Sequence, residues 1–171
     1  RTQHGPLMQA YAGFFEASDA LDAALEKSEQ ERRAVQLKQI EDSEGRSLSY
    51  YHLRIVGDGK QLALAFQADA PDLPALRTRL AEYQGLIKEI EEAGVGKDNP
   101  MWGHVRRSAD KLVRSAGRGV ERLSEGKPIT AEALAAERKA SGSWLTSDPE
   151  GAQSTIMEAY NDLVTTSNRM H

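Results

Sequence analysis

The sequence contains no cysteine, so disulfide bonds, thiol catalysis and thiolate metal sites are excluded. It also has no run of apolar residues that comes near the ~18 needed for a membrane-spanning helix. Aromatic residues make up only 6% of the chain, whereas Ala, Glu, Leu and Arg are abundant. This balance favours helices over sheets.

The charge is modest and negative. A formal net charge of −4 gives the whole molecule no general attraction to nucleic acid or anionic membranes, so only a local basic surface could bind them.

With 39% hydrophobic and 28% charged residues, the composition is that of a folded protein. The length of 171 residues suits one hydrophobic core, and we expect a single helical-bundle domain over residues 1–171.

Apolar residues recur every three or four positions in five segments of the chain, which is the spacing of one helix face. Asp72 and Asn99 are suited to be N-caps, and Gly94 is suited to end a helix. Because the connections are short, we predict an all-α protein, an antiparallel bundle of about five to six helices. The segments run from Pro6 to near Gly45, from Asp72 to Gly94, from Asn99 to Leu123, from Thr130 to Ser141, and from the Ser-Asp-Pro-Glu-Gly sequence at 147–151 to Met170.

The region at about 47–67 is compatible with two structures. Leu62, Leu64 and Phe66 alternate with polar or small residues, and Gly57–Gly59 separates two apolar runs, which predicts a β-hairpin. A helical stripe through Tyr51 also fits, as one helix or as two helices with a break. The two glycines and the aspartate between them would cost a continuous helix roughly 2 kcal/mol. Both interpretations stay open.

A basic stripe crosses the segment from His104 to Lys127, where seven Lys and Arg against three Asp and Glu give a charge of +4. The steps of four, three, four and four residues place its members along one face of a helix. Apolar residues stand two positions earlier, about 200° around the helix, so the stripe should point away from the core. Its members are Arg107, Lys111, Arg114, Arg118 and Arg122.

Two interpretations of this stripe are open. It is either a solvated face, matched in part by acids such as Glu89, Glu91 and Glu92 on a neighbouring helix, or a docking surface for an anionic partner. Lipid headgroups, a phosphorylated ligand, nucleic acid and an acidic protein are all anionic partners. Nucleic acid is disfavoured because no aromatic side chains alternate with the cations.

No catalytic signature is present in the sequence. No histidine pair has the spacing of a helical metal site, and no Glu-x-x-His, Gly-x-Ser-x-Gly or dinucleotide-binding motif occurs. We therefore predict no catalytic residues, no cofactor and no metal site. His52, beside Tyr50 and Tyr51, is expected to be a buried, hydrogen-bonded histidine rather than a ligand.

The last helical segment carries Asn161 and Asn168, seven residues apart and hence on one helix face. We expect both to hydrogen-bond to a partner helix and fix the register of packing, with a polar ligand pocket as the alternative. The Tyr-Asn-Asp-Leu-Val sequence that begins at Tyr160, the later Asn168 and the mid-chain pair Tyr50–Tyr51 resemble the YiiG-like proteins, a family of bacterial envelope lipoproteins of unknown function. The sequence at Gly57–Gly59 departs from that pattern.

The resemblance implies a helical domain in the periplasm or cell envelope, with no assigned activity and with a lipid anchor, if any, before Arg1. We interpret the chain as a non-enzymatic envelope protein that acts by binding or scaffolding, through its basic helix face, on an unknown protein or an anionic surface. The alternative is a chaperone-like or toxin-neutralising protein that binds its partner in a groove. A location in the cytoplasm stays open.

Overall fold

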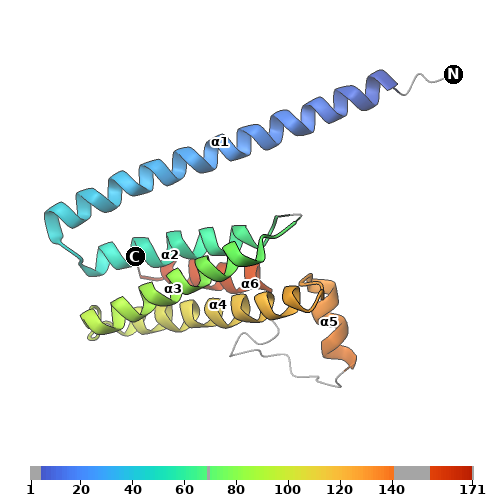
Figure 1. The fold of residues 1–171 in the computed structure, drawn as a ribbon. Coiled ribbons are helices and arrows are strands. Elements are labelled where there is room, and N and C mark those ends of the chain that lie inside the picture. The colour runs from blue at the N-terminus through green and yellow to red at the C-terminus, as the bar shows by residue number, and fades with distance from the viewer. Residues whose placement is uncertain (1–4, 69, 141–154, 171) are drawn as a thin grey trace. The chain divides into compact units, whose positions relative to one another are not determined.

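The computed structural model describes residues 5–68, 70–140 and 155–170, and these contain helices and connections but no strand. The all-α prediction is confirmed. Figure 1 shows the six helices of the described residues: α1 (Gly5–Glu44), α2 (Leu48–Ala65), α3 (Leu73–Ala93), α4 (Pro100–Ser124), α5 (Ala131–Ala140) and α6 (Ile156–Asn168).

The chain divides into two units, Arg1–Gly45 and Arg46–His171. The described part of the first unit consists of α1, whose 40 residues make a helix about 60 Å long at the standard rise per residue, and of Gly45. It ends as predicted at Gly45, whose φ of 70° favours glycine. The expectation of one domain over residues 1–171 stays a prediction.

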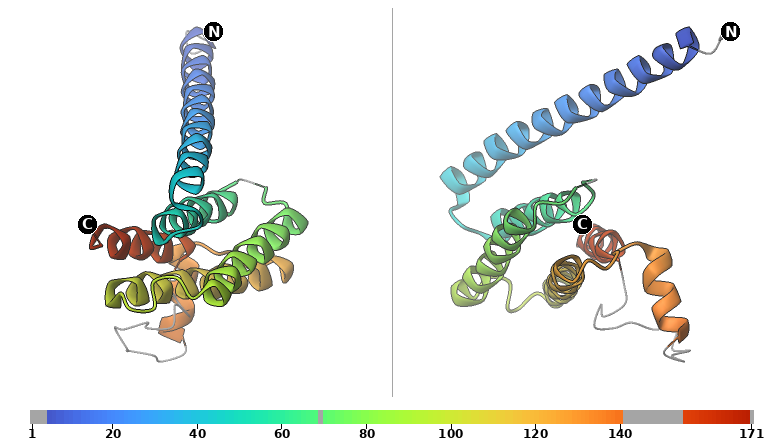
Figure 2. Two further views of the ribbon diagram at one scale, coloured as in Figure 1. Left: turned by 90° about the vertical axis from the view of Figure 1, so that its left-hand side faces the viewer. Right: turned by 45° about the vertical axis from the view of Figure 1, so that its right-hand side comes forward.

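The second unit contains the hydrophobic core. Its helices α2, α3, α4 and α6 pack together, as the two views of Figure 2 show, with α2 touching all three others. Each fully buried Leu or Ile side chain stabilises this packing by about 1.5–3 kcal/mol. The largest fully buried side chains come from all four helices and are Ile55, Leu62, Leu76, Ile90, Val105, Leu112 and Leu163.

The helix boundaries follow from capping residues that can be recognised in the sequence. The Asp72 side chain accepts a hydrogen bond from the backbone of Ala75, and the Asn99 side chain accepts from the first turn of α4. Gly94 ends α3 in a left-handed conformation with φ 66°. These three predictions are confirmed. The segment 147–151, expected to open the last helix, lies outside the described residues, and α6 starts with a capping box at Thr155.

The β-hairpin at about 47–67 is wrong, because α2 runs as one helix through Gly57–Gly59. Packing explains why glycine is used there. A Cβ atom at Gly59 would lie 3.0 Å from both Leu163 Cδ2 and Tyr83 Oη, and 3.2 Å from Leu112 Cδ2. Three helices thus approach α2 so closely at this point that the tertiary contacts outweigh the low helix propensity of the sequence.

Candidate functional site

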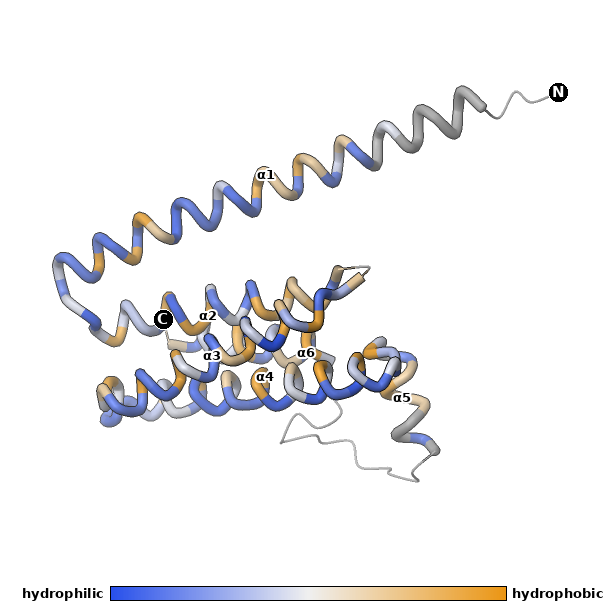
Figure 3. The backbone as a smooth tube through the Cα atoms, in the orientation of Figure 1, coloured by the Kyte–Doolittle hydropathy of each residue, from blue (hydrophilic) through white to orange (hydrophobic). Residues whose placement is uncertain are grey.

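The sequence-predicted stripe lies on α4, the most amphipathic of the described helices. Its core side is buried at Trp102, Val105, Ala109, Leu112 and Ala116. Arg107, Arg114 and Arg118 are exposed. Hydrophobic and hydrophilic residues accordingly alternate along the tube of α4 in Figure 3. We call these three exposed arginines the basic face of α4.

Arg122 does not belong to the exposed surface on which the stripe placed it. Its side chain is buried, and Nε and Nη2 both donate to the carbonyl oxygen of Pro128, at 2.9 and 2.6 Å. The fifteen residues from Arg107 to Arg122 turn the helix about 60° beyond a whole number of turns, which rotates Arg122 toward the core. It holds the connection that follows α4 rather than a ligand.

Lys111 of the stripe pairs with a residue on another helix. Its Nζ atom lies 2.6 Å from Asp162 Oδ2 of α6, and its side chain is only 19% exposed. The acids expected to match the stripe lie elsewhere. Glu89 pairs with Arg46, which precedes α2, and with Arg54 of α2. Glu91 pairs at 2.7 Å with Arg106, which lies outside the stripe.

An open groove of about 700 Å³ lies between α4 and α6, and we call it the α4–α6 groove. The two helices run antiparallel, because Ser108 and Lys111 of α4 meet Thr166 and Asp162 of α6 in reverse order. The groove is lined by Met101, His104, Arg107, Ser108, Lys111, Asp162, Thr165, Thr166 and Arg169.

The groove is basic. Arg107, Lys111 and Arg169 are its permanent cations, and Asp162 is its single carboxylate, so the lining carries a charge of +2. Arg107 Nη2 lies 2.5 Å from His104 Nδ1 on the same helix. Sequence reasoning found Arg107 and Lys111 but missed Arg169 and Asp162. The run of hydroxyl side chains from Thr165 onward was the signal that could have pointed to a polar face of α6.

Asn161 and Asn168 are both exposed, whereas side chains that fix helix register by hydrogen bonds to a partner helix are expected to be at least partly covered. The buried side of α6 centres on Leu163. Asn161 lies two residues from it, about 160° away around the helix, and Asn168 lies five residues from it, about 140° away. The polar contacts that join α6 to its neighbours come from other residues.

The His52 side chain of α2 hydrogen-bonds to Ser167 of α6, which is only 6% exposed. The imidazole also meets the Trp102 ring of α4 edge-on, at 6.2 Å between centroids. The predicted hydrogen bond of His52 is confirmed, but the side chain is only partly buried and not fully buried as expected. In addition, Ser108 Oγ and Thr166 Oγ1 lie 2.8 Å apart and join α4 to α6.

Partial burial affects one acid beside the basic face. Burial raises the pKa of Asp110 above its ordinary value, and the nearby Arg106 and Arg114 reduce this shift without cancelling it.

No group of three or more His, Asp or Glu residues that could hold a metal ion occurs among residues 5–68, 70–140 and 155–170. None of the helices within these ranges has the length and hydropathy that crossing a bilayer requires.

Fold and site together define a helical protein whose polar features are a basic helix face and a basic groove. Residues 1–169 match the family described as "Protein of unknown function (DUF3829)", and the chain belongs to this family. Over 164 residues, 96% of the chain, it is 24% identical to the uncharacterized protein YiiG of Escherichia coli (strain K12). It spans 45% of that protein's length. No solved structure matches. The resemblance to YiiG-like proteins is therefore confirmed.

Proposed function

We propose that this chain is a non-enzymatic binding domain that docks an anionic partner surface on the basic face of α4. The observation that carries the proposal is the position of Arg107, Arg114 and Arg118. All three are exposed on the helix side opposite to a fully buried apolar row, so they contribute little to the core.

The spacing of the three arginines supports a docking role. Seven residues separate Arg107 from Arg114, about 10 Å along the helix, and Arg118 lies one turn further, about 6 Å on. These separations are comparable to the Debye length of about 8 Å at physiological ionic strength, so the charges act together on a partner in contact but little at long range. The proposed partner is an acidic protein or an anionic surface.

The proposal includes a location in the bacterial envelope and a lipid anchor, which rest on the family resemblance alone. Cell fractionation of the full-length protein tests this part. Recovery with the envelope or periplasmic fraction is expected, and recovery in the cytoplasmic fraction would contradict it. The binding role does not depend on the outcome.

The decisive experiment reverses two charges. We expect the double variant Arg114→Glu/Arg118→Glu to weaken binding to vesicles of phosphatidylglycerol in phosphatidylcholine, or to an acidic polypeptide, by at least about thirtyfold, since each basic side chain near an anionic surface contributes about 1 kcal/mol. Circular dichroism should show unchanged helicity.

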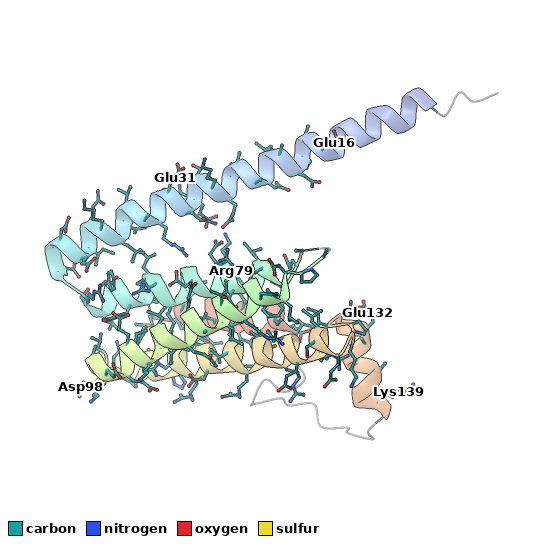
Figure 4. The ribbon with its side chains drawn as sticks, viewed as in Figure 1. Glu16, Glu31, Arg79, Asp98, Glu132 and Lys139 are labelled. Atoms are coloured by element: carbon teal, nitrogen blue, oxygen red, sulfur yellow. The ribbon has the colours of Figure 1, made fainter. Side chains whose placement is uncertain are left out.

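The matched control is Arg77→Glu/Arg79→Glu, which makes the same charge change on exposed positions of α3 (Arg79 is labelled in Figure 4). It should retain most of the binding. If both double variants lose binding equally, the effect is one of net charge and not of this face. If wild-type protein binds neither probe, the proposal is wrong.

A further inference from the structure

We infer that the α4–α6 groove binds a small phosphorylated molecule whose phosphate group is held by Arg107, Lys111 and Arg169. This site goes beyond the docking role proposed above, because it takes a small ligand and, although it shares Arg107 with the basic face of α4, uses neither Arg114 nor Arg118. It depends on a second helix, since Arg169 comes from the end of α6.

The cations come from two helices and line the same α4–α6 groove. Its volume of about 700 Å³ lies within the range of about 300–1,000 Å³ found for small-molecule sites. Arg107 and Arg169 are exposed at its edge, whereas Lys111 is mostly covered. The two guanidinium groups offer the forked donors that fit phosphate oxygens, and Lys111 adds a point charge.

The groove has a fixed polar wall. Thr166 Oγ1 donates to the carbonyl oxygen of Asp162 at 2.6 Å, and Ser108 Oγ lies 2.8 Å from the same Thr166 oxygen. The Ser108–Thr166 contact ties α4 to α6 beside the cations, so the spacing of the two helices that carry them is set by the fold. The exposed Thr165 contributes a further hydroxyl at the groove.

The charge of the lining suits a phosphate monoester. With Asp162 counted, the lining carries +2, which balances a phosphate monoester of about −1.5 to −2 at pH 7. Asp162 Oδ2 pairs with Lys111 Nζ at 2.6 Å, and therefore competes with an incoming anion for this ammonium group. Removing that carboxylate should strengthen binding, which a purely structural role of the ion pair would not predict.

The test is a calorimetric titration of the full chain with sn-glycerol 3-phosphate at constant ionic strength. We expect saturable one-to-one binding, weakened about tenfold or more in Arg107→Gln and in Arg169→Gln, because each loses a charge-assisted hydrogen bond. Asp162→Asn should bind the ester about threefold more tightly or better, since it frees Lys111 and removes a like charge. Both arginines are exposed, so these variants should keep the wild-type melting curve.

The matched controls are Glu121→Gln, which removes an exposed carboxylate from α4 outside the groove, and the Arg114→Glu/Arg118→Glu variant. Both should change ester affinity much less than Arg107→Gln does, which separates the groove from the part of the docking face formed by Arg114 and Arg118. Absence of saturable binding would overturn the inference, as would unchanged or weaker binding in Asp162→Asn.

A second arm distinguishes the source of the phosphate group. Vesicles containing phosphatidic acid are compared with pure phosphatidylcholine vesicles. If Arg107→Gln weakens binding to phosphatidic acid while the soluble ester does not bind, the site serves a lipid headgroup and the small-molecule assignment is wrong. If the soluble ester binds the protein but does not compete with phosphatidic acid vesicles for it, the small-molecule assignment stands.

Discussion

Replacing Gly59 by alanine should destabilise the protein, although alanine is the better helix former. The added Cβ would lie 3.0 Å from Leu163 Cδ2 and Tyr83 Oη and 3.2 Å from Leu112 Cδ2, and all three side chains are fully or nearly fully buried. Overpacking of this kind costs about 1–3 kcal/mol, and the gain in helix propensity returns about 1 kcal/mol.

We place the packing cost near the upper end of its range. Tyr83 cannot move freely, because its hydroxyl donates to the carbonyl oxygen of Ile55 at 2.7 Å inside the core. The expected net loss is therefore about 2 kcal/mol in the free energy of unfolding, measured by urea titration with circular dichroism.

Gly85→Ala in α3 is the matched control, because no atom lies within 4 Å of the Cβ it would gain. There only the helix propensity changes, and stability should rise by about 0.5–1 kcal/mol. The two substitutions are chemically identical but should change the free energy of unfolding in opposite directions. If Gly59→Ala is as stable as the wild type or more so, the close approach of the helices at α2 is refuted.

Three further predictions concern buried or partly buried polar groups. Arg122→Ala should lower the free energy of unfolding by about 2–3 kcal/mol through loss of the charged contact with Pro128, yet leave anion binding unchanged. Ser167→Ala should cost about 1 kcal/mol by removing the partner of His52, as urea titration would show. Asp110→Asn should stabilise the protein at pH 7, with a gain that vanishes in acid, as thermal melting across pH would show.

The sign of the Asp110 prediction follows from its raised pKa. The folded protein holds this proton more tightly than the unfolded chain does, so folding is favoured in acid and loses that contribution as the pH rises through the folded pKa. Below the ordinary value of 3.8 the carboxyl is protonated in both states, and aspartic acid and asparagine become equivalent. A gain that persisted in acid would contradict the burial explanation. Loss of anion binding in Arg122→Ala would contradict the prediction for Arg122. Wild-type stability in Ser167→Ala would contradict the prediction for Ser167.

Much of the fold could be predicted because its determinants are local. Asp72, Gly94 and Asn99 act through hydrogen bonds or backbone angles within their own turns, and their roles can be read from short segments. The conformation of α2 could not be decided in this way. Local propensity at Gly59 opposes a helix, and the contacts that favour it come from Tyr83, Leu112 and Leu163, far away in the sequence.

The candidate site was predictable only in part for the same reason. Periodicity correctly placed Arg107, Arg114 and Arg118 opposite the core of α4. It did not account for the rotation that accumulates by Arg122. Nothing local indicates that Lys111 pairs with a carboxylate on α6, because that pair depends on how two distant helices pack.

The most direct test of the account is a nuclear magnetic resonance titration of the labelled protein with an acidic polypeptide. If the basic face of α4 is the docking surface, chemical-shift changes should concentrate between His104 and Arg118 and diminish as salt is added. Changes that cluster instead on the exposed side of α3, or that spread evenly over the described helices, would contradict it.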